Sequence, residues 1–190
     1  LLRAVPVRDE IKVLGCPVLS AAVVDRAERL RAAWDALATK TVSVLNVFRD
    51  VLDPQHTTQL LAAAGAWSRV QYHAMVCADS PMPHEVAARL EQCERDVLAH
   101  ALGPFGDDLR GAGSTGWLRA TLPIGLGGLG LRPVGMIAAV ARAHDSALMD
   151  AVATGRFTSI DAIQSARKAA LLAAYEARRL HVRQLLRGPT

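Results

Sequence analysis

This sequence of 190 residues is poor in aromatic residues, in lysine and in cysteine. Aromatic residues make up only 4% of the chain although 51% of it is hydrophobic, because alanine supplies much of the apolar content. Alanine favours helix but buries little area, which argues against a large aromatic core and predicts closely packed helices around a modest one. The length fits one domain, or one domain with an extension.

Paired cysteines and long apolar runs are also lacking. Cys16, Cys77 and Cys93 are scattered, which argues against a disulfide framework and favours a reducing compartment. No apolar run reaches the roughly 18 residues of a membrane-spanning helix, so we expect no membrane span. No secretory signal is visible, and we expect an intracellular location, in the nucleus or a mitochondrion, without a basis for choosing between them. The start at Leu1 rather than Met is expected of a processed product or of part of a longer protein.

What the sequence does have is a modest excess of positive charge, carried almost entirely by arginine. The net charge is +4, and the only lysines are Lys12, Lys40 and Lys168. Arginine suits phosphate contacts and interfacial ion pairs better than lysine does. The charge therefore points mildly toward a nucleic acid partner, although a biased composition would give the same excess.

Helical periodicity dominates the chain after a first stretch with strand character. β-branched residues give residues 1–19 the character of strands. Glycine and proline in the second half of this stretch predict a short hairpin that ends near Gly15. Apolar residues at three- and four-residue spacing then predict a helix from Ser20 to about Ala38. Residues 39–52 carry both strand and helix patterns, and we favour a short helix there.

The remaining elements are predicted from capping residues and glycine or proline stops. Asp53-Pro54 predicts the start of a helix that runs to about Met75, in which Gly65 permits a close helix contact. The pattern further predicts a helix over 84–102 stopped at Gly103, a mobile loop over 105–116, a turn over 117–122 and helices over 133–154 and 159–186. The predicted fold is mainly α, a multi-helix bundle with a short N-terminal β-hairpin.

The most distinctive stretch is glycine-rich, residues 122–133, Leu-Pro-Ile-Gly-Leu-Gly-Gly-Leu-Gly-Leu-Arg-Pro. Gly125, Gly127 and Gly130 match the Gly-x-Gly-x-x-Gly pattern of dinucleotide sites. Such a site needs a strand before the glycines and a helix opening within them, but one proline interrupts the strand and another delays the helix. We therefore predict a tight crossover between helices, where glycine lets backbones approach closely.

Two further patterns resemble sites without having their context. Asp107-Asp108 after Phe105-Gly106 looks like the paired carboxylates of polymerases, but its flanking residues cannot form the apolar strands that this site needs. The second pattern is a group of histidines and cysteines that could supply zinc ligands, but their spacing fits no usual zinc site: His73, Cys77, His84, Cys93 and His100. No nucleophile elbow is present either, so the sequence predicts no catalytic residue, metal or cofactor.

The last predicted helix is the most basic element of the chain. Its acidic residues are only Asp161 and Glu176. A solvated helix face and a surface that contacts RNA or DNA phosphates explain this charge about equally well. We take its six basic residues, with one arginine at the end of the glycine-rich stretch, as candidate nucleic-acid-binding residues: Arg132, Arg167, Lys168, Arg178, Arg179, Arg183 and Arg187.

Three stretches, taken in order, resemble one family. They are Ile11-Lys12-Val13-Leu14-Gly15-Cys16-Pro17-Val18, then Asp53-Pro54-Gln55 with Leu60-Leu61 and Trp67-Ser68-Arg69-Val70-Gln71-Tyr72, then Trp117-Leu118-Arg119-Ala120-Thr121-Leu122-Pro123 with Gly127-Gly128-Leu129-Gly130-Leu131-Arg132. Together they are similar to the region just after the catalytic palm in reverse transcriptases of non-LTR retrotransposons and in related reverse-transcriptase-like proteins. The resemblance covers about residues 9–149.

The resemblance implies an organisation and a function. Residues 1–19 would be a residual palm-like hairpin, 20–155 a thumb-like helical domain and 156–190 a basic C-terminal helix. The family's catalytic aspartates precede the Leu-Gly strand, so the chain would be non-catalytic, or a fragment of an RNA-directed DNA polymerase. We expect a domain that binds the RNA or DNA backbone. The alternative is a structural subunit, with other protein subunits as partners, in a large assembly such as an organellar ribonucleoprotein.

One stretch departs from the family's pattern. Where an arginine-bearing segment is expected, this chain has Tyr72-His73-Ala74-Met75-Val76. The resemblance therefore supplies no template contact at these positions and no catalytic residue anywhere in the chain.

Overall fold

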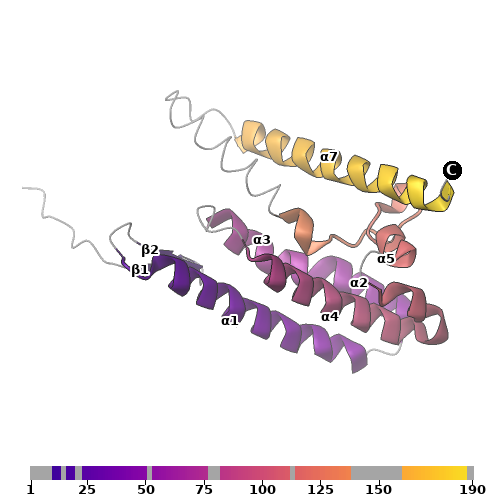
Figure 1. Cartoon of the computed structure of the whole chain (residues 1–190), viewed down its shortest axis with the longest axis horizontal. Coiled ribbons are helices and arrows are strands. Elements are labelled where there is room, and N and C mark those ends of the chain that lie inside the picture. The colour runs from indigo at the N-terminus through magenta and orange to yellow at the C-terminus, as the bar shows by residue number, and fades with distance from the viewer. Residues whose placement is uncertain are drawn as a thin grey trace, which may run out of the picture.

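The computed structural model describes residues 10–13, 16–19, 23–50, 53–76, 82–111, 114–137 and 160–187. These residues are mainly helical (Figure 1), which confirms the predicted mainly α class. None of the helices among them is long and apolar enough to cross a membrane. The predicted caps at Ser20 and Ser159, and all but the first residues of the helix predicted over 133–154, lie outside the described residues. The predicted start of the first helix at Ser20 was wrong, because residues 23–25 are not helical and the helix begins at Arg26.

Two short strands precede the helices. β1 (Glu10–Val13) and β2 (Cys16–Leu19) pair antiparallel, with Val13 opposite Cys16. β2 contacts the helices α1 and α3 that follow it in the chain. A two-stranded pair has little stability of its own, so these contacts help to hold it.

One long helix, α1 (Arg26–Val47), stands where two helices were predicted, and the 3-10 turn η1 (Phe48–Asp50) follows it. The prediction of a separate helix after Ala38 was wrong, because one apolar stripe continues across that point. Its buried residues keep a three- and four-residue spacing throughout: Leu30, Trp34, Ala38, Thr41 and Leu45. Burial of this stripe outweighs the strand preference of the β-branched residues after Ala38.

The helix predicted from Asp53 to Met75 is divided at Gly65 into α2 (Pro54–Ala64) and α3 (Ala66–Val76). Its predicted start is confirmed, because the Asp53 side chain accepts a hydrogen bond from the backbone N–H of His56 at 2.9 Å. The predicted close contact at Gly65 is also confirmed. A Cβ at this glycine would lie 2.6 Å from Oε1 of Glu94 in the next helix.

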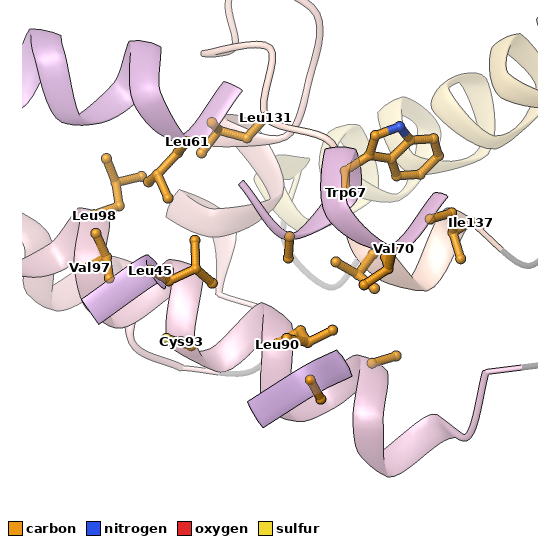
Figure 2. Close-up of a cluster of buried hydrophobic side chains, with 14 of the residues drawn as sticks. Leu45, Leu61, Trp67, Val70, Leu90, Cys93, Val97, Leu98, Leu131 and Ile137 are labelled. Atoms are coloured by element: carbon orange, nitrogen blue, oxygen red, sulfur yellow. The ribbon is translucent and has the colours of Figure 1, made fainter. Parts of the chain in front are cut away.

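That next helix, α4 (His84–Leu102), is the centre of the fold and has the predicted bounds. It contacts α1, α2 and α3, and its side chains meet theirs in the main hydrophobic core. Figure 2 shows part of this core, where Leu45 of α1 and Leu61 of α2 lie near the side chains of α4. The side chains predicted to face inward are all buried: Val86, Leu90, Cys93, Val97 and Leu98.

A 3-10 segment, η2 (Gly103–Leu109), replaces the first part of the predicted mobile loop. That prediction was wrong here, because Leu109 is buried and the segment packs against α4. Glycine and aspartate suggested a loop, and tertiary contacts with α4 give the segment a fixed place.

The last elements lie together on one side of α4. α5 (Thr115–Ala120) is capped by Ser114, whose hydroxyl accepts the Trp117 backbone N–H at 3.1 Å. The glycine-rich crossover, residues 122–133, contains the turn η3 (Ile124–Leu126) and leads into η4 (Val134–Met136). α7 (Ile160–Arg187) matches the last predicted helix within about a residue at each end, and it contacts α5 (Figure 1).

Candidate nucleic-acid interface

The glycine-rich crossover is held together by its own backbone. The N–H groups of Leu129 and Leu131 donate to the Ala120 carbonyl at 3.1 and 3.3 Å, and Gly130 N–H donates to the Leu122 carbonyl at 2.9 Å. A Cβ at Gly128 would lie 2.0 Å from the Leu122 oxygen, so only glycine fits there. These contacts confirm the predicted tight crossover. Gly125 lies within the 3-10 turn η3 and the 3-10 turn η4 follows the last glycine, which is not the strand and helix of a dinucleotide site.

Charge is unevenly distributed along the chain. Residues 114–137 contain Arg119 and Arg132 and no acidic residue, and α7 contains six basic residues against two acidic ones. Residues 1–113, in contrast, contain fourteen acidic and twelve basic residues. Because α5 contacts α7, the two basic segments come together in the fold. Among the described residues, the two segments with an excess of positive charge therefore lie next to one another, and we call them the basic side.

Several arginines outside this basic side have acidic partners. Arg29 Nε lies 2.9 Å from Asp25 Oδ2, Arg31 pairs with Glu85, and Arg110 pairs with Asp107. On the basic side, four exposed residues make no ion pair or side-chain hydrogen bond within the described residues: Arg119, Arg132, Lys168 and Arg183. Free, solvated cations of this kind are what a polyanion can neutralise.

The basic residues of α7 do not all share one face. Lys168 and Arg183 are exposed, whereas Arg179 is half-buried with its Nη1 at 3.1 Å from Oε1 of Glu176. Arg178 is half-buried on a different face of the helix, near Glu91 and Arg95 of α4. Arg167 and Arg187 belong to α7, but their side chains lie outside the described residues. Among the described side chains of α7, Lys168 and Arg183 are therefore exposed, whereas Arg178 and Arg179 are half-buried.

The Arg178 guanidinium lacks a hydrogen-bonding partner. Its Nε is buried and makes no hydrogen bond within the described residues. Burial lowers the pKa of Arg178 and the charge of Arg95 lowers it further, while Glu91 and Tyr175 oppose the shift. Because arginine remains protonated in proteins, this side chain carries a positive charge that is poorly solvated and not directly paired.

The nearby carboxylate of Glu91 is already engaged. Its Oε1 accepts the backbone N–H of Gly135 at 2.7 Å, and its Oε2 lies 3.8 Å from Nη1 of Arg95. Arg95 is itself buried, donates to Gln92 Oε1 at 2.9 Å and stacks over the Trp117 ring at 5.5 Å from its centroid. This network holds α4 against α5 and η4, and it leaves Arg178 in excess.

The aspartate pair does not form a polymerase-like site. Asp107 and Asp108 lie in η2, which packs on α4, and not between two strands. The Asp107 side chain is 81% exposed, with its Oδ1 at 3.4 Å from Nε of Arg110. Asp108 Oδ2 lies close to Gly116 at the start of α5. The two aspartates therefore make contacts at the protein surface and at the start of α5.

The candidate zinc ligands are not assembled in the described part of the chain, where no group of three His, Cys, Asp or Glu side chains could hold a metal ion. His73 is buried with its ring edge against Trp34, at 4.6 Å between centroids. Cys93 is buried, with its Sγ 3.9 Å from Oδ1 of Asn46, whereas His100 is exposed. Cys77 lies outside the described residues.

Two residues of the basic side were missed from the sequence. Arg119 escapes notice because it stands alone between apolar residues, although the absence of acidic residues over 114–137 is a usable signal. Tyr175 is half-buried on α7, close enough to Arg132 and Arg178 for both charges to affect its hydroxyl. Only the fold brings Tyr175 and Arg132 together, since they are far apart in the sequence.

No protein family, curated protein or solved structure matches this chain. The candidate interface therefore rests on the charges and geometry of the chain itself.

Proposed function

We propose that the chain is a non-catalytic helical domain, derived from a reverse transcriptase, that binds the backbone of RNA or DNA. The observation that carries this function is the group of exposed, unpaired cations on the basic side: Arg119, Arg132, Lys168 and Arg183. Phosphate contacts from such residues give affinity without sequence preference. The uneven charge distribution supports the proposal, because a simply solvated protein would gain nothing from an acid-free segment against a basic helix.

The proposed origin depends on the three sequence stretches. In this interpretation β1 and β2 are the palm-like hairpin of residues 1–19, residues 20–155 are the thumb-like domain, and 156–190 are the basic C-terminal helix. The resemblance places the family's catalytic aspartates outside this chain, so the proposal assigns it no catalytic residue. The compact crossover supports the thumb-like interpretation, because the family's Gly-Gly-Leu-Gly-Leu-Arg segment would need such a turn.

The spacing of the exposed cations suggests the length of strand that is contacted. Lys168 and Arg183 are 15 positions apart on α7, which is roughly 22 Å at the rise of an α-helix. That distance corresponds to about six nucleotides of one duplex strand. Among the described residues, the exposed aromatic side chains Tyr72 and Phe105 belong to α3 and η2 and not to α7. Contacts to phosphates therefore fit this surface better than base stacking does.

A salt titration of oligonucleotide binding tests the proposed function. The full chain is titrated into labelled 20-nucleotide RNA, single-stranded DNA and duplex DNA by fluorescence anisotropy, at several salt concentrations. We expect binding at low salt and a linear fall of log K with log salt concentration, with similar affinity for unrelated sequences. Absence of binding at low salt would overturn the proposal.

A matched pair of charge variants separates this surface from net charge. Arg132→Gln with Arg183→Gln removes two unpaired cations, and Arg29→Gln with Arg31→Gln removes two paired ones. Both double variants lose the same net charge. We expect the first to reduce affinity at least about tenfold more than the second, since each phosphate contact contributes to the salt-dependent term. Equal losses would mean that binding follows net charge and not this surface.

A second candidate, a structural subunit of a large assembly such as an organellar ribonucleoprotein, is favoured by a different observation. Three apolar side chains of the crossover are exposed to solvent: Ile124 at 77%, Leu126 at 42% and Leu129 at 40%. Grouped exposed apolar residues often mark contacts with other proteins. Size-exclusion chromatography of a native lysate tests this candidate. Migration of the chain as a free monomer would argue against it.

A further inference from the structure

The break between α2 and α3 keeps the buried faces of both helices turned inward. Thr57 and Leu61 are buried four positions apart in α2. In α3 the buried residues Ala66, Val70 and Ala74 keep the same spacing. Five positions separate Leu61 from Ala66, so in one continuous helix the second stripe would be rotated by about 100° from the first. The break removes this rotation and is therefore part of how α2 and α3 pack.

A side chain from α4 holds the start of α3 at this break. Oε1 of Glu94 accepts the backbone N–H of Ala66 at 2.7 Å. The first N–H groups of a helix have no acceptor within that helix, so this carboxyl group satisfies one of them. The Ser68 hydroxyl donates to the Gly65 carbonyl at 2.8 Å, but that bond lies within one segment of the chain. Glu94, in contrast, ties the break to α4.

The Glu94 carboxyl group also packs directly against the backbone of the break. A Cβ at Gly65 would lie 2.2 Å from the Leu61 carbonyl oxygen and 2.6 Å from Oε1 of Glu94, so there is no room for a methyl group. The position of the carboxyl group and that of the Gly65 backbone are therefore linked. If the carboxyl group leaves, the Ala66 N–H loses its acceptor and the space beside Gly65 empties.

The surroundings of this carboxyl group suit its neutral form. Glu94 is only 4% exposed, and burial raises the pKa of its carboxyl to about 8. Burial is the largest cause; the Ala66 N–H and the charge of Arg95 lower this pKa, and the charge of Glu91 raises it. Ionisation therefore puts a poorly solvated charge at the break, and exposure to water relieves its cost.

The titratable side chains of α2 and α3 are engaged elsewhere. His56, the only titratable residue of α2, has its Nδ1 2.6 Å from Oδ2 of Asp53. In α3, Arg69 donates from Nε to a backbone carbonyl of α2 at 3.3 Å, Tyr72 is exposed, and His73 packs against a tryptophan of α1. The charges that act on the buried carboxyl group therefore come from α4 itself.

We propose that the break at Gly65 is a hinge that the Glu94 carboxyl group holds closed, and that the first turn of α3 opens from α4 when this group turns to solvent. In the closed form the neutral carboxyl group accepts the Ala66 N–H in the interior. Loss of its proton shifts the population toward the open form, where the carboxylate is hydrated. The opening stays local, because α3 also contacts α1, β2 and η4.

Native-state hydrogen exchange of the unmodified full chain tests the hinge, with urea added below the unfolding transition. Exchange of the backbone N–H groups of residues 66–70 should hardly depend on urea, as for a local opening, whereas the slowest amides of α4 should follow global unfolding. If residues 66–70 respond to urea in parallel with α4, they open only when the whole protein unfolds, and the hinge is overturned.

The same measurement at several pH values tests the control by Glu94. The closed form holds the proton more tightly than the open form, so opening becomes easier as the pH rises from about 4.5 to about 8 and then levels off. After correction for intrinsic exchange rates, the opening equilibrium of residues 66–70 should rise about fiftyfold between about pH 6 and about pH 8. An opening equilibrium that does not change with pH would contradict this control.

Two matched variants of α4 identify the group responsible. Glu94→Gln keeps an acceptor for the Ala66 N–H but cannot ionise, so the rise with pH should disappear. Glu91→Gln, one turn earlier, changes a carboxyl group whose Oε1 accepts the backbone N–H of Gly135 at 2.7 Å, and it should keep most of the rise. A rise that survives in Glu94→Gln would assign the opening to another titrating group and overturn the proposal.

Discussion

The Glu94 carboxyl group accepts a hydrogen bond from the backbone N–H of Ala66 at 2.7 Å, and this contact joins the middle of α4 to the first residue of α3. It lies where the chain breaks at Gly65, so one side chain satisfies a donor that the interrupted helix leaves free. Glu94 is buried, and burial raises the pKa of its carboxyl to about 8, against an ordinary value of 4.5. The group is therefore largely protonated at neutral pH.

Glu94 predicts that the protein loses stability as the pH rises. Its folded-state pKa is above its unfolded-state value, so the folded state holds the proton more tightly between about 4.5 and about 8. The stabilisation is fully present below pH 4.5, and the free energy of unfolding should fall by a few kcal/mol as the pH rises to 8. Urea denaturation at four pH values measures this. In Glu94→Gln, which keeps the hydrogen-bond acceptor, the fall should disappear, and a fall of the same size would rule out Glu94 as its cause.

His73 predicts a loss of stability in the opposite direction. Burial lowers the pKa of His73 below its ordinary 6.5, so the folded state disfavours the charged ring. Stability should therefore fall as the pH drops below 6.5. Because Glu94 opposes this trend over the same range, the effect is best measured in the Glu94→Gln background. There, His73→Phe should remove the acid-side loss, and fluorescence of Trp34, whose ring the histidine contacts, can follow unfolding. An unchanged acid-side loss in His73→Phe would contradict this assignment.

The close packing around Gly128 predicts that a larger residue at this position destabilises the crossover. Gly128→Ala would place a methyl group 2.0 Å from the Leu122 carbonyl oxygen, so the backbone must shift. We expect a loss of about 1–3 kcal/mol in the free energy of unfolding, the usual cost of overpacking. Gly125→Ala is the matched control, because a Cβ there meets nothing within 4 Å and its backbone does not require glycine. Chemical denaturation measures the free energy of unfolding of both variants. Equal stabilities would mean that the crossover backbone shifts at little energetic cost.

Asp53 predicts the energetic value of one helix cap. Its side chain accepts the His56 backbone N–H at 2.9 Å at the start of α2. Asp53→Ala removes the acceptor and should cost about 1 kcal/mol of unfolding free energy. Asp53→Asn keeps an acceptor without the charge and should cost less. A similar loss in both variants would show that the negative charge, and not the cap, stabilises this helix.

Much of the fold follows from local patterns in the sequence. The bounds of α4 were predicted because its apolar spacing is regular and Gly103 ends it, and the cap at Asp53 is a local signal. The break at Gly65 and the continuous α1 were not predicted. Both depend on packing against α4, which a pattern within one helix does not contain.

The candidate interface was predictable only in part. Exposure of Lys168 and Arg183 agrees with a basic helix face, since helical spacing is local information. Arg178 is equally basic in the sequence, yet it is half-buried and is affected by the charges of Glu91 and Arg95, which belong to another helix. The grouping of Tyr175 with Arg132 likewise requires two segments to meet in space. Whether a charged side chain is exposed or buried depends on the tertiary structure.

The uneven charge of the chain has a consequence for the rate of association. α7 lies at the top of the view in Figure 1, and α4, which contains four acidic and two basic residues, lies below it. Such a molecule has an electric dipole, and the field of a polyanion turns it before contact. The basic side then meets the strand first, so productive encounters should be more frequent than random collision allows, and this advantage should shrink as salt shortens the reach of the field.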